Sequence, residues 1–135
     1  MTSKVVYLGE LRTAATHLRS GNIIETDAPI DNQGKGERFS PTDLVATALA
    51  SCMLTIMGMA ARTHDINIGG TECEVEKIMG TNPRRIIEVK INMHFPKEQT
   101  YDDKQKKLLE HAALTCPVIE SLHPDIKKTV SFLWN

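Results

Sequence analysis

Residues 40–64, SPTDLVATALASCMLTIMGMAARTH, decide the fold. No side chain between Leu44 and Ala61 is charged, and Cys52 lies near the middle of this run. A transmembrane helix needs about 20 predominantly apolar residues, a length that the run barely reaches. Its Ala, Ser, Thr and Gly content makes insertion less favourable. The strand-like segments on both sides carry charges, so we predict the core helix of a globular fold without a membrane partner.

The start of this helix is well marked. Ser40 is a good N-cap, and Pro41 suits the first helical position. Asp43, three residues after Ser40, completes a capping-box pattern and places a negative charge in the first turn. The sequence therefore predicts that the helix begins at Ser40–Pro41.

Because this helix is apolar, another surface is expected to cover it. At helical spacing Cys52 lies with Ala48, Leu49, Ile56 and Met59, which directs its sulfur into an apolar stripe. A helix that is apolar all round and left uncovered would expose a large hydrophobic patch. We therefore expect a homodimer in which two copies share these helices.

Composition limits the possible functions. A length of 135 residues is typical of one domain, which we predict to span residues 1–135. Sixteen Lys and Arg balance 17 Asp and Glu, leaving a net charge of -1, which does not favour nucleic acid or anionic lipid. The opening MTSKVVYLGE lacks the features of a secretory signal, so we expect a cytoplasmic protein.

Hydrophobic periodicity predicts an α+β fold with the order β-β-β-α-β-β-α-β. The fourth and fifth strands form a hairpin around GTNP, and the fifth alternates apolar and polar side chains. In chain order we expect strands at 5–10, 12–19 and 22–26, a loop at 27–39, the helix from 40, strands at 66–79 and 85–95, a helix at 102–115 and a final strand at 127–135.

The three cysteines differ in their surroundings. An odd and sparse set predicts free thiols instead of a disulfide framework. Cys73 alternates with Val75 on the apolar face of a strand whose other face is acidic, which is typical of a structural cysteine. Cys116 precedes Pro117, where one helix ends and a short following helix can begin, a position that favours a thiolate.

Two of these motifs carry a resemblance that covers most of the chain. SPTDLVATALASC, followed by TCPV at residues 115–118, resembles the two-cysteine signature of the OsmC/Ohr family, the osmotically inducible and organic-hydroperoxide-resistance proteins. The resemblance implies an intertwined homodimer with a buried central helix from each subunit and two active sites. It also implies that Cys52 attacks an organic hydroperoxide and that Cys116 resolves the product as a disulfide, without a cofactor. A lipoyl dithiol or small thiols would then reduce the protein.

A thiolate in apolar surroundings needs a positive charge nearby. The resemblance implies an arginine from the N-terminal strands, for which Arg12 is the first candidate and Arg38, in the following loop, the second. Peroxidases of the family have a glutamate after the helix-opening proline, where it holds this arginine. This chain has Thr42 there, and Asp43 lies about 100° around the helix.

The residues leave other functions open. The main alternative is a weakly active or non-catalytic OsmC-like dimer that binds a small hydrophobic molecule, its thiols being redox sensors. A metal site could combine Cys52 and Cys116 with His111 or His64, but no ligand spacing supports one, and we predict none. A cysteine hydrolase would need a histidine base and an oxyanion hole, which no local motif signals.

Overall fold

The structure is a computed structural model that describes residues 1–134. It divides into two compact units, Met1–Val45 (unit 1) and the chain from Ala46 onward (unit 2). The helices and strands follow the predicted order, with the short helix α3 beginning at Pro117 as expected and the short helix η1 as an addition. They are β1 (Ser3–Gly9), β2 (Arg12–His17), β3 (Ile23–Asp27), η1 (Ile30–Asn32), α1 (Pro41–Thr63), β4 (Glu72–Gly80), β5 (Arg85–His94), α2 (Asp103–Leu114), α3 (Pro117–Ser121) and β6 (Lys127–Leu133).

Unit 1 contains an antiparallel meander with the strand order β1-β2-β3. The second turn forms where predicted: the His17 amide donates to the Asn22 carbonyl at 2.8 Å, and Gly21 has a φ of +79° that suits glycine. Large apolar side chains of this sheet remain exposed in the single chain: Val5, Val6, Tyr7, Leu8, Ile23 and Ile24. The sheet thus offers apolar surface for another molecule to cover.

The predicted start of α1 is confirmed. The Ser40 amide donates to Asp43 Oδ2 at 2.9 Å, and the Asp43 amide donates to Ser40 Oγ at 3.0 Å. Ser40 is 1% exposed, so this reciprocal capping satisfies backbone donors at a buried position. Residues 41–45 belong to unit 1, and the remainder of α1 belongs to unit 2.

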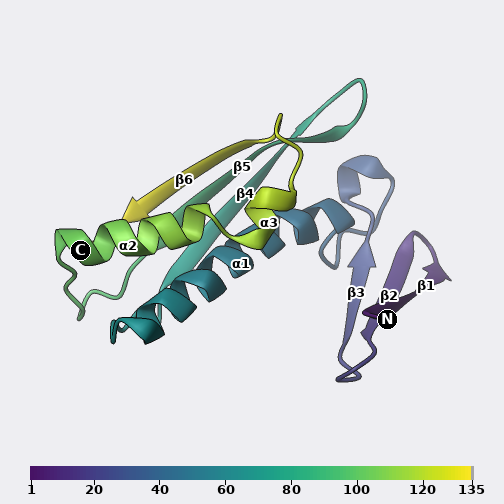
Figure 1. The fold of residues 1–135 in the computed structure, drawn as a ribbon. Helices are drawn as coiled ribbons and strands as arrows, with labels where there is room; N and C mark the ends of the chain where they lie inside the picture. Colours follow the sequence, from purple (N-terminus) through teal and green to yellow (C-terminus); the bar gives the residue numbers. More distant parts are fainter. Residues whose placement is uncertain (135) are drawn as a thin grey trace. The chain divides into compact units, whose positions relative to one another are not determined.

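Unit 2 is a three-stranded sheet with α1 and α2 on one face (Figure 1). The strand order is β4-β5-β6, in which β4 pairs antiparallel to β5 and β6 pairs parallel to it. Val89, Ile91 and Met93 of β5 are fully buried, as their alternation predicts. They pack against a set of buried residues from the two helices: Leu49, Met53, Met57, Leu109 and Ala113.

A local capping box fixes the start of α2, and the distant Trp134 contacts its second half. Asp102 and Gln105 form a capping box, with hydrogen bonds of 2.8 and 3.0 Å. Near the other end, Glu110 accepts a 2.8 Å hydrogen bond from Nε1 of Trp134, whose ring stacks on Phe95 with centroids 3.7 Å apart. These contacts tie α2 to the end of the sheet.

The start of the fourth strand differs most from prediction, whereas the other described strand ends differ by no more than two residues. Residues 66–71 were expected in the fourth strand, but β4 begins only at Glu72. A turn precedes it, in which the Thr71 amide donates to the Ile68 carbonyl at 3.1 Å and Gly70 has a φ of +90°. The pair Gly69–Gly70 favours this turn over a continuous strand. The last strand ends at Leu133, and residue 135 of the predicted range lies outside the described residues.

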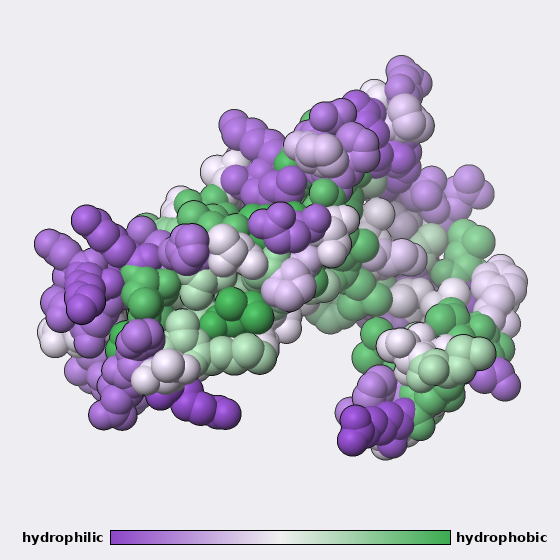
Figure 2. All heavy atoms as spheres, in the orientation of Figure 1, coloured by the Kyte–Doolittle hydropathy of each residue, from purple (hydrophilic) through white to green (hydrophobic). Residues whose placement is uncertain are grey.

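The helix α1 is buried on one side only. By length and composition α1 is long and apolar enough to cross a membrane, a property that core helices of globular proteins share. Of its most apolar stretch of 18 residues, 33% are buried. Leu49 is fully buried, but Met59 is 58% exposed and Ala48 is also exposed, so the predicted stripe around Cys52 is split between two faces. Figure 2 shows hydrophobic residues gathered along this helix.

Candidate active site

The structure brings Cys52 and Cys116 together within unit 2. Cys52, in the middle of α1, is partly buried, and Cys116 is fully buried. Both are free thiols. Burial raises the pKa of Cys116 and the Ile119 amide opposes this rise, whereas Cys52 adds to it through a hydrogen bond and its charge. The two sulfur atoms are therefore direct neighbours.

Local sequence explains the position of Cys116. The chain leaves α2 at Thr115, and Pro117 begins α3 as its first residue, so Cys116 becomes the N-cap between the two helices. Its Sγ accepts a 3.4 Å hydrogen bond from the Ile119 amide. This bond holds the sulfur in place beside Cys52.

The arrangement suits thiol–disulfide chemistry. Because the pKa of Cys116 is raised, its thiol keeps its proton and can donate a hydrogen bond to the sulfur of Cys52. A thiolate beside a protonated thiol has both the nucleophile and the group that can later attack an oxidised sulfur. Unit 2 thus holds the chemical parts of a two-cysteine redox centre.

Cys73 stands apart from this pair. It lies on β4, half-buried, opposite Met93 of β5. Burial raises its pKa to about 11, which keeps it protonated near neutral pH. Burial, and not the charge of the glutamates on the other face of the strand, is the cause of this rise in pKa.

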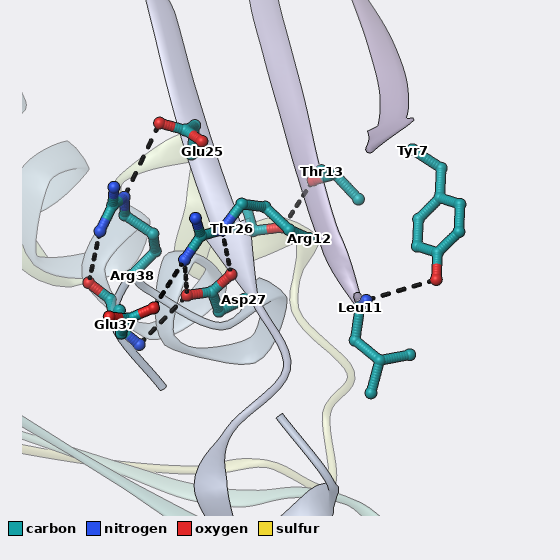
Figure 3. A network of polar contacts seen from close by, with 9 residues as sticks. All are labelled: Tyr7, Leu11, Arg12, Thr13, Glu25, Thr26, Asp27, Glu37 and Arg38. Carbon is teal, nitrogen blue, oxygen red and sulfur yellow. Dashed lines mark hydrogen bonds and ion pairs between the residues drawn. The ribbon is translucent and has the colours of Figure 1, made fainter. Parts of the chain in front are cut away.

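Arg12 belongs to unit 1 and is held by two carboxylates (Figure 3). Its Nε donates to Asp27 Oδ1 at 2.7 Å, and its Nη2 donates to Asp27 Oδ2 at 2.8 Å and to Glu37 Oε1 at 3.0 Å. Asp27 is 1% exposed, whereas the Glu37 side chain is 60% exposed. Arg12, the first candidate for the arginine near Cys52, is thus held in a fixed orientation by ion pairs.

Arg38, the second candidate, is held more loosely. Its Nε lies 3.8 Å from Glu25 Oε1, its Nη1 donates to the Glu37 carbonyl at 3.2 Å, and its side chain is 43% exposed. An open surface pocket of about 400 Å³ adjoins it, lined by Glu25, Gly36, Glu37, Arg38, Phe39 and Asp43. Three carboxylates line this pocket, which does not suit a purely hydrophobic ligand.

The partners of Arg12 were not predicted from the sequence. Counting outward from a two-residue turn at Ser20–Gly21 would pair Arg12 with Pro29, but His17 pairs with Asn22 across a longer loop, so Asp27 is the cross-strand neighbour of Arg12. Glu37 lies in an irregular loop, where no sequence pattern indicates a partner. At residue 42, the Thr42 hydroxyl lies 3.2 Å from Ser40 Oγ, at the start of α1.

Asp27 should titrate well below an ordinary aspartate. The hydrogen bonds and charge of Arg12 lower the pKa of Asp27 from 3.8 to about 2, against the effect of burial. The stabilisation from this pair is thus complete above pH 3.8 and is lost as the pH falls through about 2. Carboxyl ¹³C NMR should give this low midpoint in the wild type and a clearly higher one in Arg12→Ala, where burial still raises the pKa of Asp27 and the charge of Arg12 no longer lowers it. Equal midpoints in both proteins would contradict the ion pair.

Residues 1–134 contain no cluster of side chains that could bind a metal ion. In this described part of the chain, no three His, Cys, Asp or Glu side chains gather as metal ligands would. The thiol pair and the histidines considered with it, His64 and His111, therefore do not form a ready metal site.

The fold is α+β, and unit 2 brings the free cysteines Cys52 and Cys116 together. The model of the OsmC family, described as OsmC-like protein, matches residues 34–131, a range that includes Cys52 and Cys116. The chain belongs to this OsmC-like family. The match begins after Arg12 and Asp27, so it gives no role to either.

Solved structures agree with this assignment. A crystal structure from Psychrobacter arcticus, provisionally described as an osmotic stress induced and detoxification response protein, has 58% sequence identity and a TM-score of 0.94, covering 98% of this chain and 96% of that chain. An OsmC-like protein from Mycoplasma pneumoniae has 19% identity and a TM-score of 0.77, covering 97% and 94%. An organic hydroperoxide resistance protein OsmC from Legionella pneumophila has 15% identity and a TM-score of 0.75, covering 98% and 96%. A search of curated protein sequences gives no match.

Proposed function

We propose that this chain is a cytoplasmic thiol peroxidase that reduces organic hydroperoxides through Cys52 and Cys116 in defence against oxidative stress. The observation that carries the proposal is the contact between Cys52 and a buried Cys116 that keeps its proton. Family membership adds support, because the Legionella relative is named an organic hydroperoxide resistance protein.

The proposed reaction uses one peroxide and two thiols. The Cys52 thiolate attacks the peroxide O–O bond: an S–O bond forms, the O–O bond breaks, and the leaving alkoxide takes a proton to become an alcohol. Cys52 is then a sulfenic acid. The Cys116 sulfur attacks it, forming a disulfide and releasing water. A dithiol such as a lipoyl group, or small thiols, restores both cysteines.

An arginine has two tasks in this mechanism. It stabilises the Cys52 thiolate, and it donates hydrogen bonds to the peroxide oxygen on which negative charge develops. Arg12 is the candidate for this role because its ion pairs fix its orientation. Arg38, which is more exposed and has a longer ion pair, is the second candidate.

We further propose a homodimer. The exposed apolar residues of β1 and β3 and the uncovered side of α1 are surfaces that a second copy would cover. Such an interface would be self-complementary, with α1 of one copy facing α1 of the other across a two-fold axis.

The direct test is thiol counting with one equivalent of cumene hydroperoxide added to the fully reduced protein. We expect rapid loss of two thiols per chain and a mass decrease of about two hydrogen masses, mapped by peptide analysis to Cys52 and Cys116. Hydrogen peroxide should react more slowly, because it lacks an apolar group to bind near Cys52. Thiols that stay reduced for minutes at equimolar cumene hydroperoxide would overturn the proposal.

A second candidate function follows from residue 42. Because Thr42 replaces the glutamate of the family's peroxidases, the chain could instead bind a small hydrophobic molecule, its thiols being redox sensors. In that case the reduced protein would bind an apolar fluorescent probe with unchanged thiol content, and excess hydroperoxide would not be turned over. Catalytic consumption of many equivalents of hydroperoxide would exclude this candidate.

A further inference from the structure

The guanidinium of Arg12 is bound on one side only. Three hydrogen bonds use the N–H of Nε and both N–H groups of Nη2, with Asp27 and Glu37 as acceptors. Asp27 accepts two of them in the parallel fork geometry that matches a guanidinium to a carboxylate. The two N–H groups of Nη1 have no partner within residues 1–134. Because the side chain is 21% exposed, Nη1 is the part of the guanidinium left to bind a ligand.

Asp27 is itself fixed from several directions. It lies directly opposite Arg12 in the β2–β3 register, so the sheet sets the spacing of the pair. The Glu37 amide donates to Asp27 Oδ2 at 3.1 Å, and the Asp27 amide donates to the Phe39 carbonyl at 3.1 Å. The carboxylate therefore holds Arg12 and also fastens the loop that carries Glu37.

We propose that Asp27, assisted by Glu37, is the positioning residue that orients Arg12 and leaves Nη1 free to donate to a peroxide oxygen or to a thiolate. This inference rests on the proposed function, in which Arg12 assists Cys52. In the peroxidases of the family, a glutamate after the helix-opening proline supplies the negative charge that holds the arginine. In this chain Asp27, on β3, supplies that charge. Thr42, which occupies that position here, carries no charge to pair with an arginine.

The chemistry of the fork makes Asp27→Asn the informative substitution. An amide has nearly the shape of a carboxylate but only one acceptor oxygen, and its NH₂ group would face a guanidinium nitrogen. The fork is lost, and Arg12 is free to turn. Because a misplaced catalytic group can cost about 100-fold in rate, we expect Asp27→Asn to slow Cys52 oxidation by cumene hydroperoxide by roughly that factor.

Two further variants complete the series. Asp27→Glu keeps the charge and should recover part of the rate, which simple loss of packing would not allow. Glu37→Gln removes one hydrogen bond at an exposed side chain, so it should fold normally and lose about tenfold or less. The matched control is Glu76→Gln, which removes an exposed ion pair with Lys90 and should leave the rate unchanged.

A readout independent of turnover completes the test. The Nε–H signal of Arg12 in ¹⁵N NMR should be protected from exchange in the wild type and lost in Asp27→Asn, with thermal unfolding followed in parallel. Slow oxidation and a lost Arg12 signal, with rescue by Asp27→Glu, are the expected results. Equal oxidation rates in wild type, Asp27→Asn and Glu37→Gln would overturn the positioning role alone. No oxidation in the wild type would instead remove the proposed function, and the positioning role in that reaction with it.

Discussion

A Cys52→Ser chain should show no hydroperoxide turnover above background. A serine hydroxyl is not ionised near neutral pH and does not attack the O–O bond as a thiolate does. Peroxide consumption with a lipoyl dithiol as reductant should therefore fall to the rate measured without protein. The matched control is Cys73→Ser, which should keep wild-type activity because Cys73 lies away from the pair.

Cys116→Ser should separate the two chemical steps. The first attack needs only Cys52, so the variant should consume one equivalent of cumene hydroperoxide in a single burst. It should then stop as a sulfenic acid, detectable with dimedone, because the buried thiol that forms the disulfide is missing. Continued turnover by Cys52→Ser would eliminate the mechanism, and full multiple turnover by Cys116→Ser with a dithiol reductant would eliminate the resolving role.

Ala48→Asp should convert a dimer into folded monomers. Ala48 is exposed on α1 in the single chain, so an aspartate there is solvated when the chain is alone. In a dimer with facing α1 helices, two like charges would be buried together, and an unpaired buried charge costs about 3–5 kcal/mol. Light scattering should give a dimeric mass for the wild type and a monomeric mass for the variant, with unchanged circular dichroism.

The control for assembly is Thr81→Asp, at the exposed turn between β4 and β5, which should remain dimeric. A monomeric wild type, or a dimer that tolerates aspartate at residue 48, would show that the α1 face is not the interface.

Much of the fold follows from the sequence because its determinants are local. The capping residues Ser40 and Asp43, the alternation of β5 and the amphipathic pattern of α2 each depend on neighbours within a few residues. The parallel pairing of β6 with β5 does not, because strand partners and register are set by distant packing. The turn before β4 was missed because Ile66 and Ile68 gave it the composition of a strand.

The site was predictable to a smaller extent. The resemblance singled out Cys52 and Cys116, but sequence spacing gives no distance, and only the fold shows the two sulfurs as neighbours. Arg12 was singled out without its partners, because Glu37 reaches it from an irregular loop that no pattern positions. The approach of an arginine to Cys52, the dimer and the peroxidase activity stay predictions.

The parallel pairing of β6 has a consequence for synthesis of the chain. Strand β6 takes its place beside β5 only after the intervening segment, which holds α2 and Cys116, has crossed over the sheet. A ribosome-bound chain that has not yet extended past Lys127 therefore has β5 as an open sheet edge, and such edges invite pairing with other chains. Cys116 is made before that edge closes, so the nascent protein passes through a stage in which its second thiol exists without a finished fold around it. Chaperones that cover the edge during this interval would lower both aggregation and premature oxidation.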